Sequence, residues 1–198
     1  ILRAMGGMLA GIVYRPLWTR YLLLIVAELL AIFGVFVLMP TIGERFVTSF
    51  INQLPVHEAS PYKRVWNGGI DAFHTAPVIG IGPDNYRILC PKISAGNPDV
   101  DCHTHPHNFY IQLLGETGLI GLALGVAMVV SIIWACLRAN LANRRDVLAA
   151  TCFVVPFGLF FPVQSTADFF GQWNNTFMWS AIAFALVVAH KTSSSKHE

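Results

Sequence analysis

The chain has 198 residues, of which 55% are hydrophobic and 12% are charged, and its mean hydropathy is +0.56. Soluble domains carry about a quarter charged residues, so this composition argues against a soluble protein and indicates a chain in contact with lipid. The formal net charge of +2, with no basic stripe interleaved with aromatic residues, argues against binding to nucleic acid.

The N-terminal residues 1–14 are mostly apolar, carry Arg3 as their charge and show no A-x-A-like cleavage site. We therefore expect no cleavable signal peptide. Because the chain begins at Ile1 rather than Met, we expect it to be the C-terminal portion of a longer protein.

Four apolar stretches are predicted to cross a membrane, because a hydrocarbon core needs roughly 20 apolar residues in a helix. The first stretch contains Glu28, and Pro156 and Pro162 interrupt the third. We predict an all-α integral membrane protein with four transmembrane helices and a long external loop that contains short amphipathic helices. The predicted spans are residues 21–39, 118–137, 147–163 and 173–189.

The distribution of Lys and Arg predicts the orientation, since the basic loops of membrane proteins are cytoplasmic. Basic residues lie before the first span, between the second and third, and after the fourth: Arg15, Arg20, Arg138, Arg144, Arg145, Lys191 and Lys196. The turn 164–172, which holds Asp168, has no Lys or Arg. We therefore expect this turn and the long loop 41–117 to be external.

The predicted organisation has six parts. Residues 1–40 are an N-terminal segment with the first span, 41–117 a periplasmic loop with the candidate site, and 118–137 the second span. Residues 138–146 are a cytoplasmic loop, 147–190 the third and fourth spans with a short periplasmic turn, and 191–198 a cytoplasmic tail.

Two short helices are predicted within the long loop. Ser60-Pro61 is an N-cap followed by proline at the first helical position, and apolar residues then recur at helical spacing through Phe73. A second helix is expected to open at His105-Pro106 and to run through Leu114. Between them, residues 80–85 are rich in turn-forming residues; their G-x-G lacks the strand–turn–helix context of a nucleotide site.

The four cysteines divide by location. Cys136 and Cys152 lie within predicted spans, where we interpret them as small packing residues. Cys90 and Cys102 both lie on the external loop. Because an oxidising compartment permits disulfides, we predict that these two are joined.

The densest polar cluster is the run from Asp101 to Asn108, with histidines at positions 103, 105 and 107. Alternating histidines on an extended segment share a face and could bind a metal, but Pro106 and a following helix would spoil that geometry. A solvent-exposed polar loop is a second interpretation of the same residues.

The third interpretation is an anion site. If Pro106 is the first helical residue, His107 lies in the first turn, where free backbone N–H groups and the helix dipole favour negative charge. Arg64 can supply a bidentate guanidinium for phosphate oxygens. The helix dipole favours neutral His107, the form that a general base needs, whereas a bound diphosphate would favour the protonated form. Glu116 is expected to orient the His107 helix rather than to react.

These residues also carry a family resemblance. His107-Asn108, nine further residues and Gly118-Leu119-Ile120-Gly121 match the H-N-x9-G-x-x-G pattern of the O-antigen ligase family. That family comprises O-antigen ligases, O-antigen polymerases and bacterial protein O-oligosaccharyltransferases. Upstream, Arg64 through Ala72-Phe73 and the P-x-x-G-x-G run that starts at Pro77 resemble another of its segments. The family often has His directly before that proline, where this chain has Ala76.

The resemblance implies a multi-pass glycosyltransferase of the bacterial inner membrane, acting at the periplasmic face without metal or cofactor. It implies transfer of a glycan from an undecaprenyl-diphosphate donor to an acceptor hydroxyl, with His107 catalytic and Arg64 binding the diphosphate. His103, His105, Asn108 and Asp168 are further candidate substrate-binding residues. An arginine on an earlier loop is also implied, so we expect this chain alone to be inactive.

The acceptor distinguishes the members of the family. We expect lipid A-core, the acceptor of ligases; a growing glycan for polymerases and a protein hydroxyl for oligosaccharyltransferases are the alternatives. Two other classes are a transporter, which would place ionisable residues within its spans and show inverted repeats, and a non-catalytic assembly subunit. The concentration of polar residues in the loop favours the enzyme. Its expected partners are the lipid-linked glycan, the acceptor and the bilayer.

Overall fold

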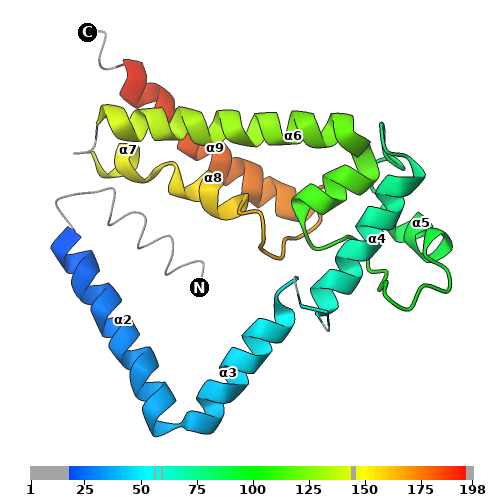
Figure 1. The fold of residues 1–198 in the computed structure, drawn as a ribbon. Coiled ribbons are helices and arrows are strands. Elements are labelled where there is room, and N and C mark those ends of the chain that lie inside the picture. The colour runs from blue at the N-terminus through cyan, green and yellow to red at the C-terminus, as the bar shows by residue number, and fades with distance from the viewer. Residues whose placement is uncertain (1–17, 56, 59, 144–145, 195–198) are drawn as a thin grey trace. The chain divides into compact units, whose positions relative to one another are not determined.

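The structure is a computed structural model that describes residues 18–55, 57–58, 60–143 and 146–194. The expectation for residues 1–14, and the topological markers Arg15, Arg144, Arg145 and Lys196, therefore lie outside the described residues. All regular structure in the described part is helical, as predicted. Figure 1 shows the helices α2 (Trp18–Leu38), α3 (Pro40–Gln53), α4 (Pro61–Thr75), α5 (Tyr86–Ile93), α6 (Phe109–Ala142), α7 (Val147–Thr151), α8 (Val154–Leu159) and α9 (Gln172–Ser194).

The chain forms two compact units, and all but one of the boundaries between them fall inside helices; the exception lies between Phe160 and Phe161. The first unit comprises Ile1–Phe46, Val129–Phe160 and Met178–Glu198, and the second comprises Val47–Met128 and Phe161–Phe177. Long helices can therefore belong to both: α3, α6 and α9 each begin in one unit and end in the other.

The first unit has a core of small and apolar residues drawn from α6, α9 and the α7–α8 segment: Cys136, Ala139, Cys152, Phe153, Ala185 and Ala189. Both cysteines are buried and free. One buried polar side chain, Asn140, donates to the carbonyl of Ala150 at 2.5 Å. Its amide is thus partnered, as a polar group away from water must be.

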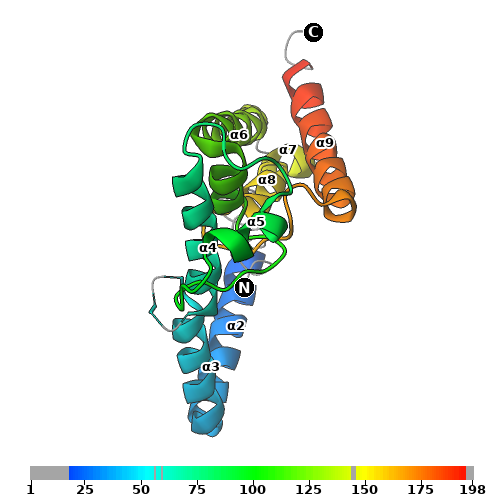
Figure 2. The same ribbon diagram turned by 90° about the vertical axis from the view of Figure 1, so that its right-hand side faces the viewer.

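The second unit has a small core where α4 packs against α5 (Figure 2). Ala72, Tyr86 and Cys90 form it and are fully buried. The Tyr86 hydroxyl donates to the Val65 carbonyl at 3.2 Å, and burial raises the pKa of this hydroxyl, with the neighbouring carboxylates adding to the shift. Tyr86 therefore holds α5 onto α4 as a neutral hydrogen-bond donor.

Helix α6 is broken at Gly118, which has φ of 66° and ψ of −166°. At the break, some backbone N–H and C=O groups of α6 have no hydrogen-bond partner inside the helix. The loop after α4 provides these partners. Ile81 and Gly82 donate to the carbonyls of Gly115 and Glu116 at 3.1 and 2.9 Å. Leu119 and Ile120 donate back to the carbonyls of Pro77 and Val78 at 2.9 and 3.3 Å.

Glycine is required on both sides of this junction. Gly80 and Gly118 have positive φ angles, which few other residues tolerate. A Cβ at Gly80 would collide with the backbone of Glu116, and one at Gly118 with the backbone of Val78. The two glycine motifs noted in the sequence thus meet at one point of backbone-to-backbone contact.

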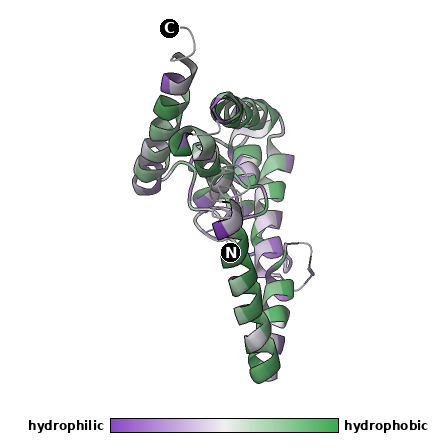
Figure 3. Ribbon diagram, turned by 90° about the vertical axis from the view of Figure 1, so that its left-hand side faces the viewer, coloured by the Kyte–Doolittle hydropathy of each residue, from purple (hydrophilic) through white to green (hydrophobic). Residues whose placement is uncertain are grey.

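Within the described part of the chain, one helix, α6, is by length and composition able to cross a membrane. Helices α2 and α3 would form a second span only if both belong to one crossing of the membrane, with the 114° bend between them inside it. In Figure 3 the ribbon of α2 is hydrophobic along most of its length, and many of its large apolar side chains are exposed, Leu23 at 69% and Phe33 at 66%. Soluble proteins rarely expose such a continuous apolar surface, whereas a bilayer would solvate it.

Several predicted elements differ from the structure. The predicted span 147–163 is helical only in part, because α7 ends at Thr151, α8 begins at Val154 and the helix ends at Leu159. Pro156 explains the interruption, since its ring has no N–H to donate and clashes with the carbonyl four residues earlier. The helix expected from His105-Pro106 begins instead at Phe109.

The long loop contains more helix than the sequence analysis predicted. Helix α4 lies where it was expected, although Ser60 makes no side-chain cap and its hydroxyl donates to the Gln53 carbonyl at 3.1 Å. Helices α3 and α5 were not predicted. The apolar spacing of Ile42, Phe46 and Phe50 could have indicated α3, whereas Pro91 inside α5 obscures that helix.

Candidate active site

The three histidines predicted to carry chemistry lie together in the second unit. The ring of His107 has its centroid 4.3 Å from that of His105 and 5.4 Å from that of His103, both in edge-on orientations. His103 Nε2 lies 3.5 Å from Asp101 Oδ2. The segment thus gathers three imidazoles and one carboxylate, with His107 contacting both other rings.

The first turn of α6 is formed differently from the expected one. Asn108 is the capping residue: its Oδ1 accepts from the N–H groups of Tyr110 and Ile111 at 3.0 and 3.2 Å. His107 precedes this cap and has φ of 54°. His107 is therefore not in the first helical turn, and its backbone has a left-handed conformation that few non-glycine residues adopt.

The loop between α8 and α9 holds this backbone in place. Thr166 N–H donates to the His107 carbonyl at 2.9 Å, and the Thr166 carbonyl lies 3.1 Å from His105 Nε2. Asn108 Nδ2 donates to the carbonyl of Pro162 at 2.6 Å. Both ends of the Asn108 amide are thus used within the protein, and the side chain is 2% exposed, so a substrate-binding role for Asn108 stays a prediction.

A buried polar network lies one and two turns further along α6. Gln112 and Glu116 are each 1% exposed. Gln112 Nε2 donates to Asp168 Oδ1 at 2.6 Å and to Glu116 Oε2 at 3.1 Å, and Gln112 Oε1 accepts from Phe169 N–H at 2.9 Å. Glu116 Oε1 accepts from Tyr86 N–H at 2.8 Å.

This network ties two segments to α6: the start of α5 and the Asp168 turn. Through that turn it also supports the Thr166 contacts to the histidines. Glu116 fits the orienting role that its position predicted. Asp168 bonds to Gln112 and also accepts from Phe170 N–H at 2.9 Å. Its carboxylate thus holds the turn together, and the substrate-binding role expected for Asp168 stays a prediction.

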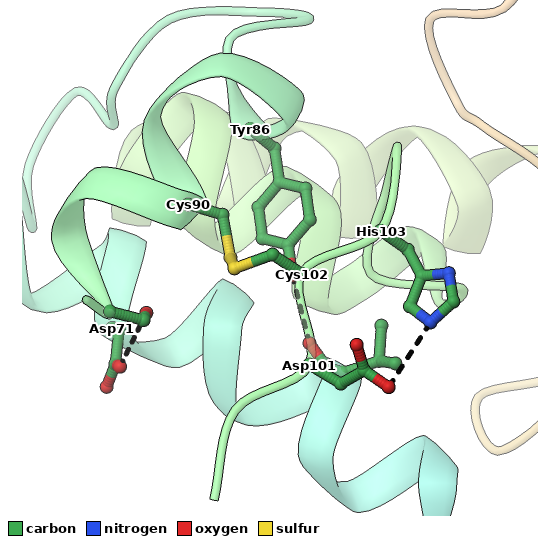
Figure 4. Close-up of a disulfide and its surroundings, with 8 residues drawn as sticks. Asp71, Tyr86, Cys90, Asp101, Cys102 and His103 are labelled. Atoms are coloured by element: carbon green, nitrogen blue, oxygen red, sulfur yellow. Dashed lines mark hydrogen bonds and ion pairs between the residues drawn. A yellow bond between two sulfur atoms is a disulfide. The ribbon is translucent and has the colours of Figure 1, made fainter. Parts of the chain in front are cut away.

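A disulfide joins Cys90 of α5 to Cys102, immediately before the histidine segment, with a Cα–Cα distance of 5.8 Å (Figure 4). Figure 4 also shows Tyr86 beside the disulfide and His103 pointing toward Asp101. Asp101 N–H donates to the Arg64 carbonyl at 3.2 Å. The histidine segment is therefore fixed to α5 by a covalent bond and to α4 by a backbone hydrogen bond.

Arg64 lies in the first turns of α4, with its side chain exposed. It lines a pocket of about 440 Å³ together with Glu58, Lys63, Asn67 and Asp99. Among the described residues, no hydrogen bond or ion pair joins the Arg64 side chain to the histidines. The structure thus connects Arg64 to the histidine segment through the backbone and leaves its guanidinium open to a ligand.

Electrostatics favour a neutral His107. Burial lowers the pKa of His107 below its ordinary value of 6.5, the neighbouring His105 and His103 lower it further, and hydrogen bonding with the Thr166 backbone opposes them. Repulsion between imidazolium groups and partial loss of hydration both disfavour the charged ring. Near pH 7, His107 is therefore the unprotonated imidazole that can accept a proton.

The described part of the chain contains no group of three or more His, Cys, Asp and Glu side chains arranged to hold a metal ion. The three histidines are close, but His105 Nε2 is directed at the Thr166 carbonyl and its Nδ1 lies 3.1 Å from Thr104 Oγ1. The ring nitrogens of His105 are thus engaged by the protein itself.

The chain combines a long apolar helix with a polar unit in which clustered imidazoles are firmly held. These features define the class of the protein as membrane-associated, with an enzyme-like site. A family model described as O-antigen ligase matches residues 2–126, which include Arg64, the histidine segment and both glycine motifs. The chain belongs to this family, whose members have glycosyltransferase-type roles in lipopolysaccharide and polysaccharide assembly. No curated protein and no solved structure matches the chain.

Sequence reasoning missed two parts of the site. Thr166 was not predicted because it contacts the histidines mainly through its backbone, which leaves no signal in the residue type. Gln112 was not assigned to the site from the sequence, whereas the structure places it at the centre of the buried network. A glutamine and a glutamate at i and i+4 in an otherwise apolar helix were the signal available.

Proposed function

We propose that this protein transfers a glycan from an undecaprenyl-diphosphate donor to a hydroxyl of lipid A-core, at the periplasmic face of the bacterial inner membrane. One observation carries the proposal: His107 is held by backbone contacts, surrounded by two further imidazoles and has a lowered pKa. This combination is that of a general base at neutral pH.

In the proposed reaction the acceptor O–H gives its proton to a ring nitrogen of His107. The acceptor oxygen forms a bond to the anomeric carbon of the first sugar as the bond between that carbon and the diphosphate oxygen breaks. The diphosphate leaves with the electron pair, still attached to its lipid. Arg64, exposed and without an ion-pair partner among the described residues, is available to stabilise the charge that develops on this leaving group.

The proposed topology places the whole site on one side of the membrane. The loop 41–117 and the turn 164–172 are both predicted to be external. The second compact unit contains most of this loop and the whole of this turn. The bonds from Thr166 to His107 and from Gln112 to Asp168 require these segments to share a compartment. The contacts thus support placing both segments on the same side of the membrane, and the distribution of Lys and Arg supports the periplasmic side.

The same donor chemistry serves a polymerase or a protein O-oligosaccharyltransferase, so these remain alternative functions. Deleting the gene separates them, because cells would lose capped lipopolysaccharide, long glycan chains or glycosylated protein respectively. We expect loss of capped lipopolysaccharide. A transporter or a non-catalytic assembly subunit would instead tolerate loss of the proposed base.

The decisive experiment is His107→Ala in the full-length protein, expressed in cells that otherwise lack it. General-base catalysis typically contributes a factor of roughly 10² to 10⁴, so we expect glycan transfer to fall at least about a hundredfold at an unchanged membrane level. Transfer should survive treatment with EDTA, because no metal takes part in the proposed step. Near-normal transfer by His107→Ala would show that the proposed function is wrong.

A further inference from the structure

The pocket beside Arg64 is polar on every side. It is lined by Glu58, Lys63, Arg64, Asn67 and Asp99, all within the second unit. Its volume of about 440 Å³ falls within the roughly 300 to 1,000 Å³ of pockets that bind small molecules. Among the residues that the structure describes, no apolar side chain lines it, so this lining suits a polar ligand better than an alkyl or polyprenyl chain.

The charges that line the pocket balance but do not pair. Lys63 and Arg64 are cationic, Glu58 and Asp99 are anionic, and none of the four side chains forms an ion pair within the described part of the chain. Their hydrogen-bonding capacity is therefore available to a ligand. A balanced mixture of donors and acceptors matches the hydroxyl groups of a sugar, each of which both donates and accepts.

The wall of the pocket is fixed before any ligand arrives. Asn67 Nδ2 donates to the Asp99 carbonyl at 3.0 Å, and Asp99 N–H donates to Asn97 Oδ1 at 3.0 Å. The bond from Asp101 N–H to the Arg64 carbonyl and the disulfide at Cys102 hold the following residues. A site ordered in this way loses little entropy when it binds.

The pocket is also close to the histidines. Asp99 is four residues before His103, so their Cα atoms are at most about 14 Å apart even if the chain between them is fully extended. His103 in turn lies against the ring of His107. A ligand that spans one or two sugar units could therefore contact the pocket and still place a reacting atom near His107.

We propose that this pocket binds the first sugars of the lipid-linked donor, with Glu58, Asn67 and Asp99 bonding to sugar hydroxyls and Lys63 joining Arg64 on the phosphate oxygens. The inference rests on the proposed function and deepens it. It assigns recognition of the donor sugar to α4 and the Asp99 loop, and leaves the acceptor to be bound elsewhere.

The test uses Asp99→Ala and Glu58→Ala in membranes that carry the protein, with lipid-linked glycan extracted from the producing cells as the donor. Neither carboxylate has a hydrogen-bond partner in the described part of the chain, so both variants should fold. We expect the KM for the donor to rise roughly tenfold to a hundredfold, the factor that one hydrogen bond to a charged group is worth. The kcat at saturating donor and the KM for the acceptor should stay within about twofold.

Glu44→Ala is the matched control, because it removes an exposed carboxylate from α3, outside the pocket, and should leave both KM values unchanged. An unchanged donor KM in Asp99→Ala and Glu58→Ala would overturn the sugar site, while loss of transfer in His107→Ala would still support the proposed function. A rise in the acceptor KM instead would assign the pocket to the acceptor sugar and overturn the donor assignment. Near-normal transfer by His107→Ala would remove the function on which the inference rests.

Discussion

At the scale of single residues, the backbone of His107 is in a conformation that costs free energy. A φ of 54° in a non-glycine residue is uncommon, and such strain is on the order of 1 to 3 kcal/mol. The bond from Thr166 and the cap formed by Asn108 compensate by fixing the residues around it. Strained conformations concentrate at functional sites, which agrees with the role proposed for His107.

The lowered pKa of His107 gives a prediction for the pH dependence of transfer. A base must be neutral to accept a proton, so kcat/KM should fall as the pH drops through the pKa of His107 in the folded protein. Because that pKa lies below 6.5, the acidic limb of the profile should have its midpoint below 6.5. His103→Ala removes one of the groups that lower this pKa, so the limb should move to higher pH while activity near pH 7.5 changes little.

The measurement is the rate of transfer against pH in membranes, at donor concentrations below KM. His74→Ala is the control, because His74 is exposed at the end of α4 and is not among the groups that shift His107. If the midpoint of the acidic limb of the pH profile did not change in His103→Ala, this would contradict electrostatic coupling between the rings of His103 and His107. Complete inactivity of His103→Ala would favour the metal interpretation, which requires several histidines at once.

At the scale of elements, helix α6 is the scaffold of the site. Its first turns carry Asn108, Gln112 and Glu116, each 2% exposed or less. A pattern of Asn, Gln and Glu at four-residue spacing places these side chains on one face. The sequence therefore shows that a polar stripe exists, but its partners in α5 and in the loop before α9 are distant in sequence and were not predictable from it.

Gln112 should prove to be a positioning residue. Gln112→Met keeps the size of the side chain and removes its bonds to Asp168, Glu116 and the Phe169 N–H. The Asp168 turn should then loosen and release the Thr166 contacts to His107. We expect kcat to fall about tenfold or more with little change in the donor KM, measured in membranes at equal protein level.

The control is Asn140→Leu, which also removes a buried amide and leaves the Ala150 carbonyl without its donor, but in the other compact unit. Unsatisfied buried groups cost about 1 to 3 kcal/mol each, so both variants should lower the melting temperature. Only Gln112→Met should lower kcat. Loss of activity in proportion to loss of stability in both variants would show that Gln112 acts through folding alone.

At the scale of the whole molecule, the chain separates a polar unit from an apolar one. The second unit holds the histidine cluster, the disulfide and the polar pocket. The first holds the apolar core of small residues and the exposed apolar surface of α2. Such a division suits a protein that keeps its chemistry in an aqueous compartment and its anchor in lipid.

The proposed topology predicts which positions can be labelled from outside the cell. Ala95 and Ser165 are exposed and belong to the second unit, whereas Lys191 is exposed and belongs to the first. With cysteine introduced singly at these positions, a membrane-impermeant maleimide should label positions 95 and 165 in cells whose outer membrane has been opened. Position 191 should react only after the inner membrane is permeabilised. Labelling of position 191 from outside, or opposite results at 95 and 165, would contradict the topology.

Composition and local pattern were enough to predict several features of the chain. Apolar runs predicted helices that the structure has as α2, α6 and α9, the Ser60-Pro61 signal located α4, and the motif around His107 indicated the family that the comparison shows. These features follow from nearest-neighbour chemistry, because a helix satisfies its own backbone and a motif is contiguous.

The tertiary structure alone decided which distant groups meet. The docking of Gly80 onto the break at Gly118 and the bond from Thr166 to His107 both join segments far apart in sequence. Each is made largely by backbone atoms, which are identical in every residue and leave little trace in the sequence. The broken α7–α8 segment shows the same limit, since Pro156 marked an interruption but packing fixed where each helix ends.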